Sequence, residues 1–156
     1  MTAPARAMVT VRRTSPHEPA ATALLLASHA YLASLYAPED NHYLSVEALA
    51  DPKIDFLLAE ADGVALGCAA LADKGCYGEI KSMYVAPETR GAGTGAALMT
   101  ALDAAARARG LDVLRLETGD TLHPAQRLYA RHGFAVRGPF GDYAEAPHSV
   151  FMEKRL

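Results

Sequence analysis

Apolar residues recur at helical spacing in two long segments of the chain, and each segment predicts an amphipathic α-helix. The first covers residues 18–36, with Leu25 and Leu32 on its apolar side. The second covers residues 93–109, where Leu98 belongs to the apolar stripe and the glycine that follows ends the helix. Two shorter helical segments are predicted over residues 46–50 and 124–132.

Shorter apolar runs around these helices predict seven β-strands. They cover residues 7–13, 55–61, 64–72, 76–85, 113–118, 134–138 and 149–155. Asp62-Gly63 joins the second and third runs, and this dipeptide between two apolar runs is a strong hairpin signal. The order β-α-α-β-β-β-α-β-α-β-β predicts an α+β fold, with a mixed, mostly antiparallel sheet of about seven strands flanked by about four helices. No linker or repeat interrupts the pattern, so we expect one domain over residues 1–156.

The composition fits a globular protein and argues against several other classes. Of the 156 residues, 51% are hydrophobic and 21% are charged, which suits a folded domain with one substantial core. The net charge of −3 disfavours nucleic-acid binding, because phosphate backbones reward a basic face. No apolar run approaches the ~20 residues that span a bilayer, and residues 1–13 lack the apolar stretch of a signal peptide, so we expect a cytoplasmic protein without a membrane partner. Cys68 and Cys76 are too few for a disulfide framework or a zinc site, so no metal is expected.

The segment 84–95, Y-V-A-P-E-T-R-G-A-G-T-G, is the most informative about function. An apolar strand ends at Val85, Pro87 prevents its continuation, and alternating glycines then lead into a predicted helix. A glycine-rich turn that opens a helix directs unpaired backbone N–H groups and the positive end of the helix dipole at one point. Such a turn suits a phosphate or pyrophosphate, because glycine lets the backbone approach the ligand closely.

Spacing separates the kinds of phosphate-binding turn. A P-loop requires G-x-x-x-x-G-K-[ST], and no lysine follows these glycines. A dinucleotide fingerprint requires glycines directly after the strand, whereas residues 86–90 intervene here and include a proline. An ordinary glycine-rich turn without a ligand is a further alternative. Another pattern, [QR]-x-x-G-x-[GA], is matched at every position by Arg90, Gly93 and Gly95.

This last pattern resembles the acyl-CoA pyrophosphate loop of the GNAT superfamily of N-acetyltransferases. Residues 128–134, L-Y-A-R-H-G-F, are similar to a second motif of that family, L-Y-x-x-x-G-F, and the predicted element order is that of the GNAT fold. The resemblance covers nearly the whole chain, strongly from Glu79 to Phe134 and weakly before Ile54. It implies an acyl-CoA N-acyltransferase fold and an enzyme that moves an acetyl group from acetyl-CoA to an amine, by direct attack in a ternary complex.

The resemblance also implies where the co-substrate acetyl-CoA binds. Its pyrophosphate would lie on Arg90, Gly91, Ala92, Gly93, Thr94 and Gly95. In the GNAT fold the strand before this loop splays from its parallel neighbour, and the pantetheine arm pairs with the freed main chain, here that of Met83, Tyr84 and Val85. The N–H of Met83 or Tyr84 would then donate to the developing oxyanion.

Glu79 is the general base that the resemblance implies. Family members that use a strand glutamate carry it eleven positions before the loop arginine, as Glu79 precedes Arg90. Strand alternation predicts that Glu79, Lys81, Met83 and Val85 share one face. The alternative is a glutamate that only pairs with Lys81 or with solvent.

Tyr129 is the implied general acid for the departing thiolate. In the family motif the tyrosine hydroxyl lies near the cofactor sulfur, and a phenol of pKa ~10 is protonated at neutral pH. The alternative is a core aromatic beside Leu128 and Phe134. Many family members carry an asparagine seven positions earlier, where this chain has Leu122, so that contact to the pantetheine arm is lost or replaced, for example by His123.

The acceptor side of the site is less clearly encoded. The positions that border the acceptor pocket in this fold are occupied by His42, Glu117, Asp142 and Tyr143. Glu117 and Asp142 would make the pocket acidic, which suits a cationic amine on a small molecule or at a protein amino terminus. A homodimer is expected from family habit. Two other functions stay open: a non-catalytic acyl-CoA-binding regulatory module and a nucleotide-binding α/β domain.

Overall fold

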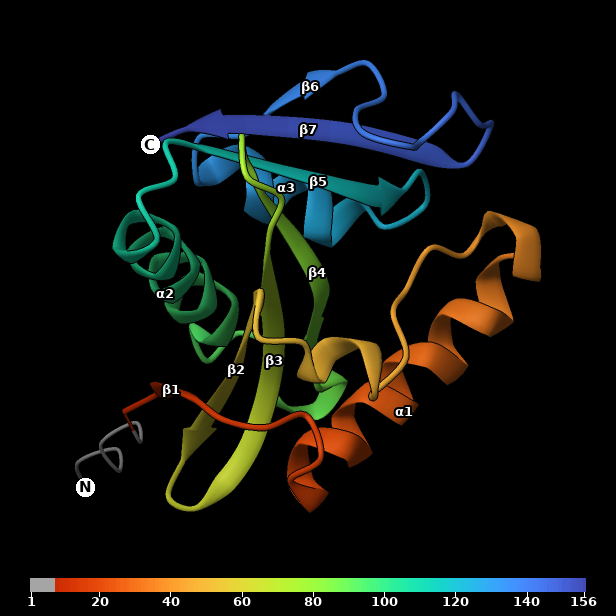
Figure 1. Cartoon of the computed structure of the whole chain (residues 1–156). Helices are drawn as coiled ribbons and strands as arrows, with labels where there is room; N and C mark the ends of the chain where they lie inside the picture. Colours follow the sequence, from red (N-terminus) through yellow and green to blue (C-terminus); the bar gives the residue numbers. More distant parts are fainter. Residues whose placement is uncertain (1–7) are drawn as a thin grey trace.

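The computed structural model describes residues 8–156 and contains a seven-stranded sheet with helices on both faces (Figure 1). The strands are β1 Thr10–Arg13, β2 Ile54–Ala61, β3 Val64–Asp73, β4 Gly78–Val85, β5 Val113–Gly119, β6 Ala135–Arg137 and β7 Ser149–Arg155. The α-helices are α1 Pro19–Leu35, α2 Thr94–Ala108 and α3 His123–Arg131, and 3₁₀ turns cover Pro38–Asp40, Ala48–Ala50 and Pro87–Thr89. The predicted fold class is confirmed, although the helix predicted over residues 46–50 is a single 3₁₀ turn. Ala7, where the first predicted strand begins, lies outside the described residues.

The sheet has the strand order β1-β2-β3-β4-β5-β7-β6, and every neighbouring pair is antiparallel except β4 and β5. Asp62 and Gly63 join β2 to β3 with φ angles of 51° and 76°, which match a tight turn that follows the twist of its strands. The predicted Asp-Gly hairpin is therefore confirmed. The one parallel pair requires a crossover, and α2 supplies it.

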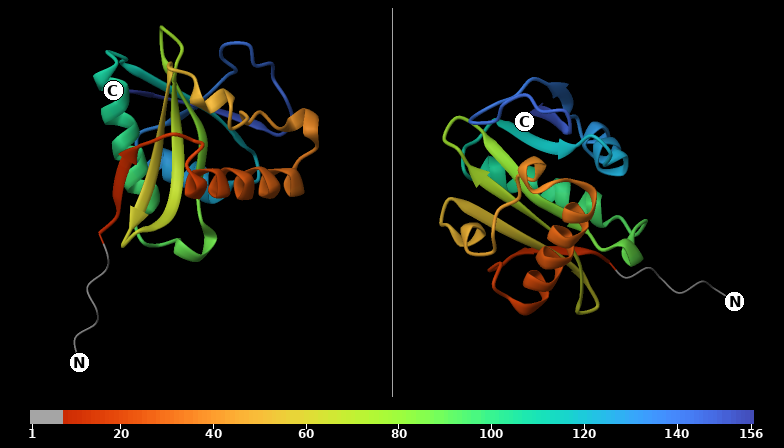
Figure 2. Two further views of the ribbon diagram at one scale, coloured as in Figure 1. Left: turned by 60° about the horizontal axis from the view of Figure 1, so that its bottom comes forward. Right: turned by 90° about the vertical axis from the view of Figure 1, so that its right-hand side faces the viewer.

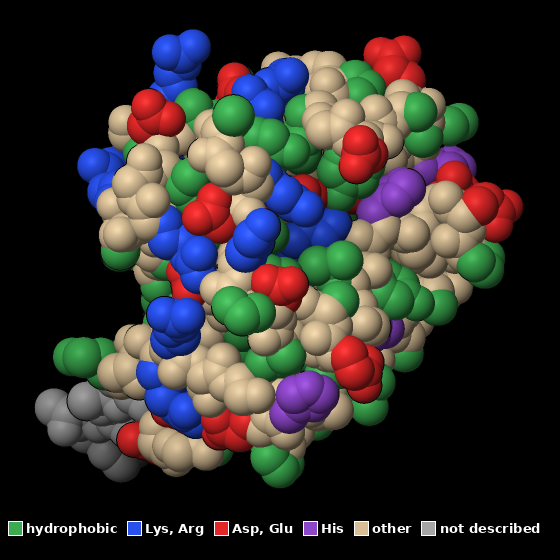
Figure 3. All heavy atoms as spheres, in the orientation of Figure 1, with side chains coloured by type: hydrophobic (Ala, Val, Ile, Leu, Met, Phe, Trp, Pro, Cys, Tyr) green, Lys and Arg blue, Asp and Glu red, His purple; other side chains and the backbone are tan. Residues whose placement is uncertain are grey.

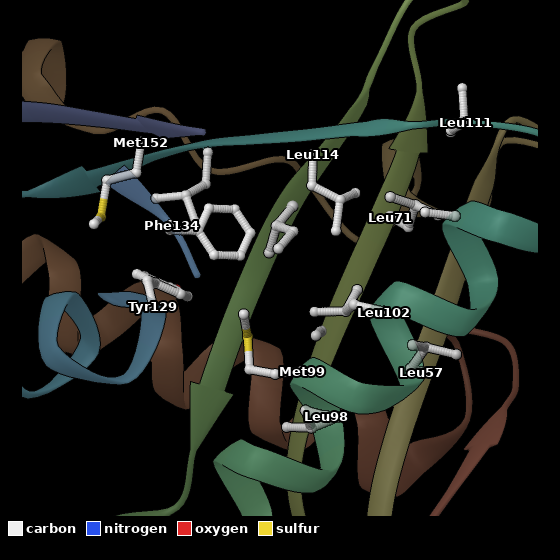
Figure 4. Close-up of a cluster of buried hydrophobic side chains, with 14 of the residues drawn as sticks. Leu57, Leu71, Leu98, Met99, Leu102, Leu111, Leu114, Tyr129, Phe134 and Met152 are labelled. Carbon is white, nitrogen blue, oxygen red and sulfur yellow. The ribbon is translucent and has the colours of Figure 1, made fainter. Parts of the chain in front are cut away.

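Helices cover the sheet on opposite faces, with α1 on one side and α2 and α3 on the other (Figures 1 and 2). The core beneath α2 and α3 includes Leu71, Leu98, Leu102 and Leu114, all of them fully buried (Figure 4). A second core beneath α1 is built around Phe56. The central strands bury both faces, which is why their sequences read as continuous apolar runs.

β4 and β5 are paired over only three residues of each strand. Gly78–Ile80 lies beside Leu114–Leu116, and the ladder between the two strands stops there. β4 nevertheless continues to Val85, and β5 continues to Gly119. The backbone groups along the diverging edges are therefore left for a partner other than the neighbouring strand.

A β-bulge at Ser82 changes which side chains of β4 share a face. The register against β3 shifts at this point, and Ser82 has a φ of 56°. Met83 and Val85 pack in the core beneath α2, as Ile80 does, whereas the side chain of Lys81 reaches the loop that follows α1. The prediction that Glu79, Lys81, Met83 and Val85 share one face is therefore wrong, because the bulge shifts the alternation after Lys81.

An ion-pair cluster around the buried carboxylate of Asp55 fastens the end of α2 to β2. Asp55 is 5% exposed and accepts two hydrogen bonds from the guanidinium of Arg109, of 2.7 and 3.0 Å. Arg109 also donates to Asp73 and to the carbonyl of Pro52, and Arg13 forms an ion pair with Asp55 at 2.9 Å. The hydrogen bonds from Arg109 hold the pKa of Asp55 below its usual value.

We expect Asp55→Asn to lower the free energy of unfolding by about 3 kcal/mol at neutral pH, because Arg109 then lacks its main counter-charge. The lowered pKa means that the contribution of Asp55 is complete at neutral pH and is lost as the pH falls below about 4. Urea unfolding at several pH values tests this, and the difference between wild type and variant should shrink in acid. Glu60→Gln, which loosens the more exposed pair with Arg12, is the control and should cost much less. Equal losses for the two variants would contradict the prediction.

Candidate active site

A cavity of about 520 Å³ opens where β4 and β5 diverge. Its glycine-loop half is formed by lining residues between 83 and 96 and between 124 and 132. Its α1 half is formed by lining residues between 28 and 43, by residues 80–82, 117–119, 121 and 122, and by His148. Figure 3 shows acidic and histidine side chains close together at the right-hand edge of one face, over the end of α1 and the loop after it.

The glycines of the loop are required for two different physical reasons. Gly91 and Gly93 have φ angles of 86° and 84°, which side chains rarely allow, and no atom lies within 4 Å of a Cβ built on either. These two positions require glycine because of their backbone conformation, and the space around them is open. At Gly95 a Cβ would lie 2.9 Å from Leu128, so this glycine lets α3 pack closely against the start of α2.

The start of α2 carries polar groups without partners in the protein. Oγ1 of Thr94 is buried and has no hydrogen-bond partner, and the first N–H groups of a helix have none within the helix. The N-cap residue is Gly93, so no side chain caps this end. Arg90 and Arg131 line the same half of the cavity, whereas Ala92 does not line it. This half therefore offers hydrogen-bond donors, the positive end of a helix dipole and two guanidinium groups. Together they suit the diphosphate of a CoA thioester.

The diverging edge of β4 forms the floor between the two halves. Met83, Tyr84 and Val85 line the cavity beyond the last residue that pairs with β5. Oγ of Ser82 is buried without a hydrogen-bond partner, and its carbonyl accepts a hydrogen bond from the thiol of Cys68 at 3.3 Å. An extended ligand with amide groups could pair with this edge as an added strand does.

Glu79 lies behind the cavity wall and not on it. Its side chain is 5% exposed, and its Oε2 accepts a hydrogen bond of 2.6 Å from the hydroxyl of Tyr143. Lys81 Nζ lies 3.4 Å from the same oxygen and donates to the Tyr143 hydroxyl at 2.9 Å and to the carbonyl of His42 at 2.8 Å. We call Glu79, Lys81 and Tyr143 the Lys81 cluster. Burial, and then the bond to Glu79, raise the pKa of Tyr143, so its hydroxyl remains a donor.

Glu117 lines the cavity from β5, and Asp40 lines it from the loop after α1. Glu117 follows the last residue of β5 that pairs with β4, and its Oε2 accepts a hydrogen bond of 2.8 Å from Ser149 on β7. No basic side chain of residues 8–156 forms an ion pair with it within 4 Å. Burial raises the pKa of Glu117, and the hydrogen bond from Ser149 and the charges of His42 and Lys81 oppose that rise.

Tyr129 is both a core aromatic and a cavity-lining residue. Its ring meets that of Phe134 edge to face at 5.9 Å between centroids, and its side chain is 5% exposed. Within the described chain, no hydrogen bond involves its hydroxyl, and the residue lines the glycine-loop half. Burial, followed by the charge of Glu117, raises the pKa of Tyr129, so the phenol stays protonated over the whole neutral range.

Aromatic rings line the α1 half. His29 and Tyr43 are stacked, with ring centroids 4.1 Å apart and planes 14° apart. Nε2 of His29 is buried without a partner, and burial lowers the pKa of this imidazole, which favours its neutral form. Tyr36 hydrogen-bonds Thr121 through their hydroxyls at 2.5 Å, and it packs on Gly119 so closely that a side chain there would clash. Tyr36 thereby holds the end of α1 against the end of β5.

Most of the predicted site residues meet at this cavity, and they come from elements far apart in the sequence. Those that line it are His42, Met83, Tyr84, Val85, Arg90, Gly91, Gly93, Thr94, Gly95, Glu117 and Tyr129. Asp142 does not, because it is exposed in the turn before Tyr143, so Glu117 and Asp142 do not form an acidic pocket together. Tyr143 does not line the cavity and touches the site through Glu79, Lys81 and the ring of His42.

The sequence around several site residues gives no local indication of their roles. Gln126 donates to the carbonyls of Gly119 and Asp120, at 2.9 and 3.2 Å, and so fixes the turn that leads into α3. His123 is exposed at the start of that helix and does not line the cavity, so it does not replace the missing asparagine there. The roles of Tyr36 and Lys81 depend on partners dozens of residues away, which spacing alone does not reveal.

Neither thiol belongs to the cavity. Cys68 is buried among apolar groups, which raises the pKa of its thiol to about 12, and Cys76 is exposed elsewhere. Among residues 8–156 no three His, Cys, Asp or Glu side chains are grouped so that they could hold a metal ion. The helices of the same residues include none long and apolar enough to cross a membrane.

Comparisons with known proteins agree with this geometry. The Acetyltransferase (GNAT) family model matches residues 21–134. A relative from Azospirillum brasilense, named an IAA acetyltransferase, is 45% identical over 95% of this chain and 98% of its own length. The crystal structure of a candidate acyl-CoA N-acyltransferase from Klebsiella pneumoniae is 36% identical, with a TM-score of 0.81 over 96% of this chain and 98% of that chain.

A more distant structure has the same fold with its ligand in place. A GNAT family acetyltransferase from Elizabethkingia anophelis, solved with acetyl-CoA bound, is 18% identical, with a TM-score of 0.68 over 95% of this chain and 98% of that chain. The family match includes the glycine loop, both diverging strands and Tyr129, and it excludes a nucleotide-binding domain. This chain belongs to the GNAT family of acetyl-CoA-dependent N-acetyltransferases.

Proposed function

We propose that this enzyme transfers the acetyl group of acetyl-CoA to the amine of a small acceptor, by direct attack while both substrates are bound. One observation carries the proposal: a single cavity runs from the glycine loop to Glu117, past the diverging edge of β4. Acetyl-CoA supplies the activated acetyl group, and the acceptor supplies the neutral amine that attacks it. No thiol lines the cavity, which favours direct transfer over an acetylated cysteine.

The glycine-loop half would hold the co-substrate. Backbone N–H groups of the loop and of the first turn of α2 suit the pyrophosphate, with the hydroxyl of Thr94 as a further donor. The pantetheine arm would pair with the β4 edge at Met83, Tyr84 and Val85, whose positions on the cavity wall support this role. The N–H of Met83 or Tyr84 would then donate to the oxyanion.

Glu117 is the better-placed proton acceptor for the attacking amine. It lines the cavity, it has no ion-pair partner among the described residues, and its raised pKa is closer to the pKa of an efficient base at neutral pH. Glu79 is occupied by Tyr143 and Lys81 behind the wall, so it would act only after a rearrangement or through a relay. Glu79 as the base stays the prediction from sequence, and the two roles are separable by experiment.

Tyr129 is the proposed acid for the departing thiolate. Its hydroxyl has no competing partner in the described chain, and its raised pKa keeps it protonated. The name of the Azospirillum relative adds IAA to the acceptors worth assaying. A cytoplasmic location, a homodimer and the single-domain extent over residues 1–156 stay predictions.

We expect Gly93→Val to weaken acetyl-CoA binding by at least ~10-fold, about 1.4 kcal/mol. Valine is strained at a φ of 84°, and its branches would occupy the space left for the phosphates. Calorimetric titration with acetyl-CoA measures the effect. Gly110→Val is the matched control, because Gly110 also has a positive φ, 73°, and open space but lies at the far end of α2. The proposal fails if both variants fold and bind acetyl-CoA equally well.

Replacing each glutamate by glutamine should separate their roles. We expect Glu117→Gln to lower kcat by ~10²–10⁴-fold and Glu79→Gln to lower it far less, with the same acceptor. A base must be ionised, so the rate should fall as the pH drops through the pKa of Glu117, and the raised pKa places that limb above the usual ~4.3. Glu117→Gln should remove the limb. The reverse order of effects would identify Glu79 as the base.

Tyr129→Phe should lower kcat while the affinity for acetyl-CoA and the stability stay nearly unchanged, because the ring packing on Phe134 is kept. The pKa of Tyr129 is raised, so its ionisation should produce no alkaline limb near ~10, and the variant should differ only in its plateau. Tyr77→Phe removes a phenol hydroxyl outside the cavity and is the control. If wild type and Tyr129→Phe reach the same plateau of kcat, Tyr129 is a core aromatic residue and not the acid.

A further inference from the structure

The charges in the α1 half of the cavity restrict the acceptor, provided that the proposed acetyl transfer to an amine is correct. The acidic and basic residues that line this half are Asp40, Lys81 and Glu117, together with the imidazoles of His42 and His148, whereas Arg90 and Arg131 line the glycine-loop half. An acceptor that carries a carboxylate or phosphate needs a cation with free donor capacity. Among the described residues that line the α1 half, Lys81 is the only lysine, and none is an arginine.

Lys81 is already committed to groups of the protein. Its ammonium donates to the carbonyl of His42 and to the hydroxyl of Tyr143, and it lies 3.4 Å from the carboxylate of Glu79. Two of its three protons are thus donated to groups of the protein, and the ion pair with Glu79 engages its charge. Its side chain is 11% exposed, and Glu79 neutralises its charge. Lys81 therefore offers little to an anionic acceptor.

The carboxylates of the same half form no ion pair within the described part of the chain. Neither Glu117 nor Asp40 has an ion-pair partner within 4 Å among residues 8–156. Glu117 shares one oxygen with Ser149, which leaves the other for an ammonium group. An acceptor with a carboxylate next to its amine would bring a like charge to Glu117, and at distances of ~4 Å this repulsion is enough to lower kcat/KM by at least ~100-fold.

Rings form much of the remaining wall. Tyr31, Tyr36 and Tyr43 line the α1 half together with His29, and Tyr31 and Tyr43 are 44% and 41% exposed. The stack of His29 on Tyr43 is a flat surface, and the lowered pKa of His29 keeps that surface uncharged at neutral pH. Leu32 adds an apolar side chain between these positions. Tyrosine faces prefer a planar, polarisable group, because ring contacts add to area burial.

We propose that the acceptor is a primary amine that carries an aromatic ring and no carboxylate, an arylalkylamine. Its ammonium binds at Glu117, which removes one proton to give the neutral nucleophile, and its ring lies against the tyrosines of the α1 half. The amine nitrogen then forms a bond to the acetyl carbonyl carbon and gives up its second proton. The carbon–sulfur bond breaks, and the thiolate takes a proton from Tyr129 and leaves as the thiol of CoA, while the proton from the nitrogen replaces the one that Tyr129 gave.

Matched pairs of acceptors test the two parts of this proposal. 2-Phenylethylamine and phenylalanine differ only in the carboxylate, and 2-phenylethylamine and hexylamine differ in the ring. With the full-length enzyme and acetyl-CoA, thiol release and mass spectrometry of the N-acetyl product give kcat/KM for each. We expect 2-phenylethylamine to exceed phenylalanine by at least ~100-fold and hexylamine by at least ~10-fold. Equal or greater kcat/KM for phenylalanine, hexylamine or spermidine would overturn the proposal.

Two variants test the residues. Glu79→Gln removes the counter-charge of Lys81, so the ratio of kcat/KM for 2-phenylethylamine to that for phenylalanine should fall by at least ~10-fold. Tyr43→Ala should reduce kcat/KM for 2-phenylethylamine more than for hexylamine, and the second substrate serves as the internal control for folding. If both ratios stay at the wild-type value, the assignment of these residues is wrong.

The outcomes also separate this inference from the proposed function. N-acetylated phenylalanine or spermidine as the main product would overturn the arylalkylamine alone and leave the acetyltransferase intact. Failure to acetylate any amine of the panel, with acetyl-CoA bound normally, would count against both.

Discussion

The early end of the pairing between β4 and β5 is the constraint on which the rest of the site depends. After three paired residues on each strand the ladder stops, yet both strands continue for several residues. A sheet that stayed paired would fill this space with its own hydrogen bonds and would leave no unpaired edge for a ligand. The separation also carries the glycine loop, at the end of β4, and Glu117, on β5, to the walls of one cavity. Fold and binding site are thus consequences of the same local departure from regular pairing.

The bulge at Ser82 determines which residues of β4 can take part. It turns Met83 and Val85 into the core beneath α2, and it leaves Lys81 on the side of α1, where the loop carbonyl of His42 and the hydroxyl of Tyr143 reach it. Glu79 is drawn into the same cluster and away from the cavity. The carboxylate of the neighbouring strand, Glu117, is left on the wall. The bulge therefore decides which later side chains of β4 enter the core, whereas Glu79 and Glu117 lie in stretches of regular pairing.

Local signals in the sequence predicted the elements well, because the physical causes of those elements are local. The Asp62-Gly63 turn needs two positive φ angles, and Gly93 needs one at the start of α2, so both positions are visible in the residue types. The bulge was not predictable, since Ser82 adopts a positive φ that serine shows rarely. The contacts of Tyr36 with Thr121 and of Lys81 with Tyr143 span 85 and 62 residues, so no spacing rule could reveal them.

The Lys81 cluster contributes more to the arrangement of the site than to the stability of the fold. A buried ion pair gains little net stability, because desolvation offsets most of the attraction between its charges. Apolar residues of the same volume would hold the same segments together at lower cost. What apolar residues could not do is tie the loop after α1, the strand β4 and the turn before β7 to one ammonium group with directed hydrogen bonds. That arrangement fixes the α1 half of the cavity and engages the lysine that lines it, so the unpaired charges that an acceptor meets there are those of Glu117 and Asp40, beside the aromatic rings.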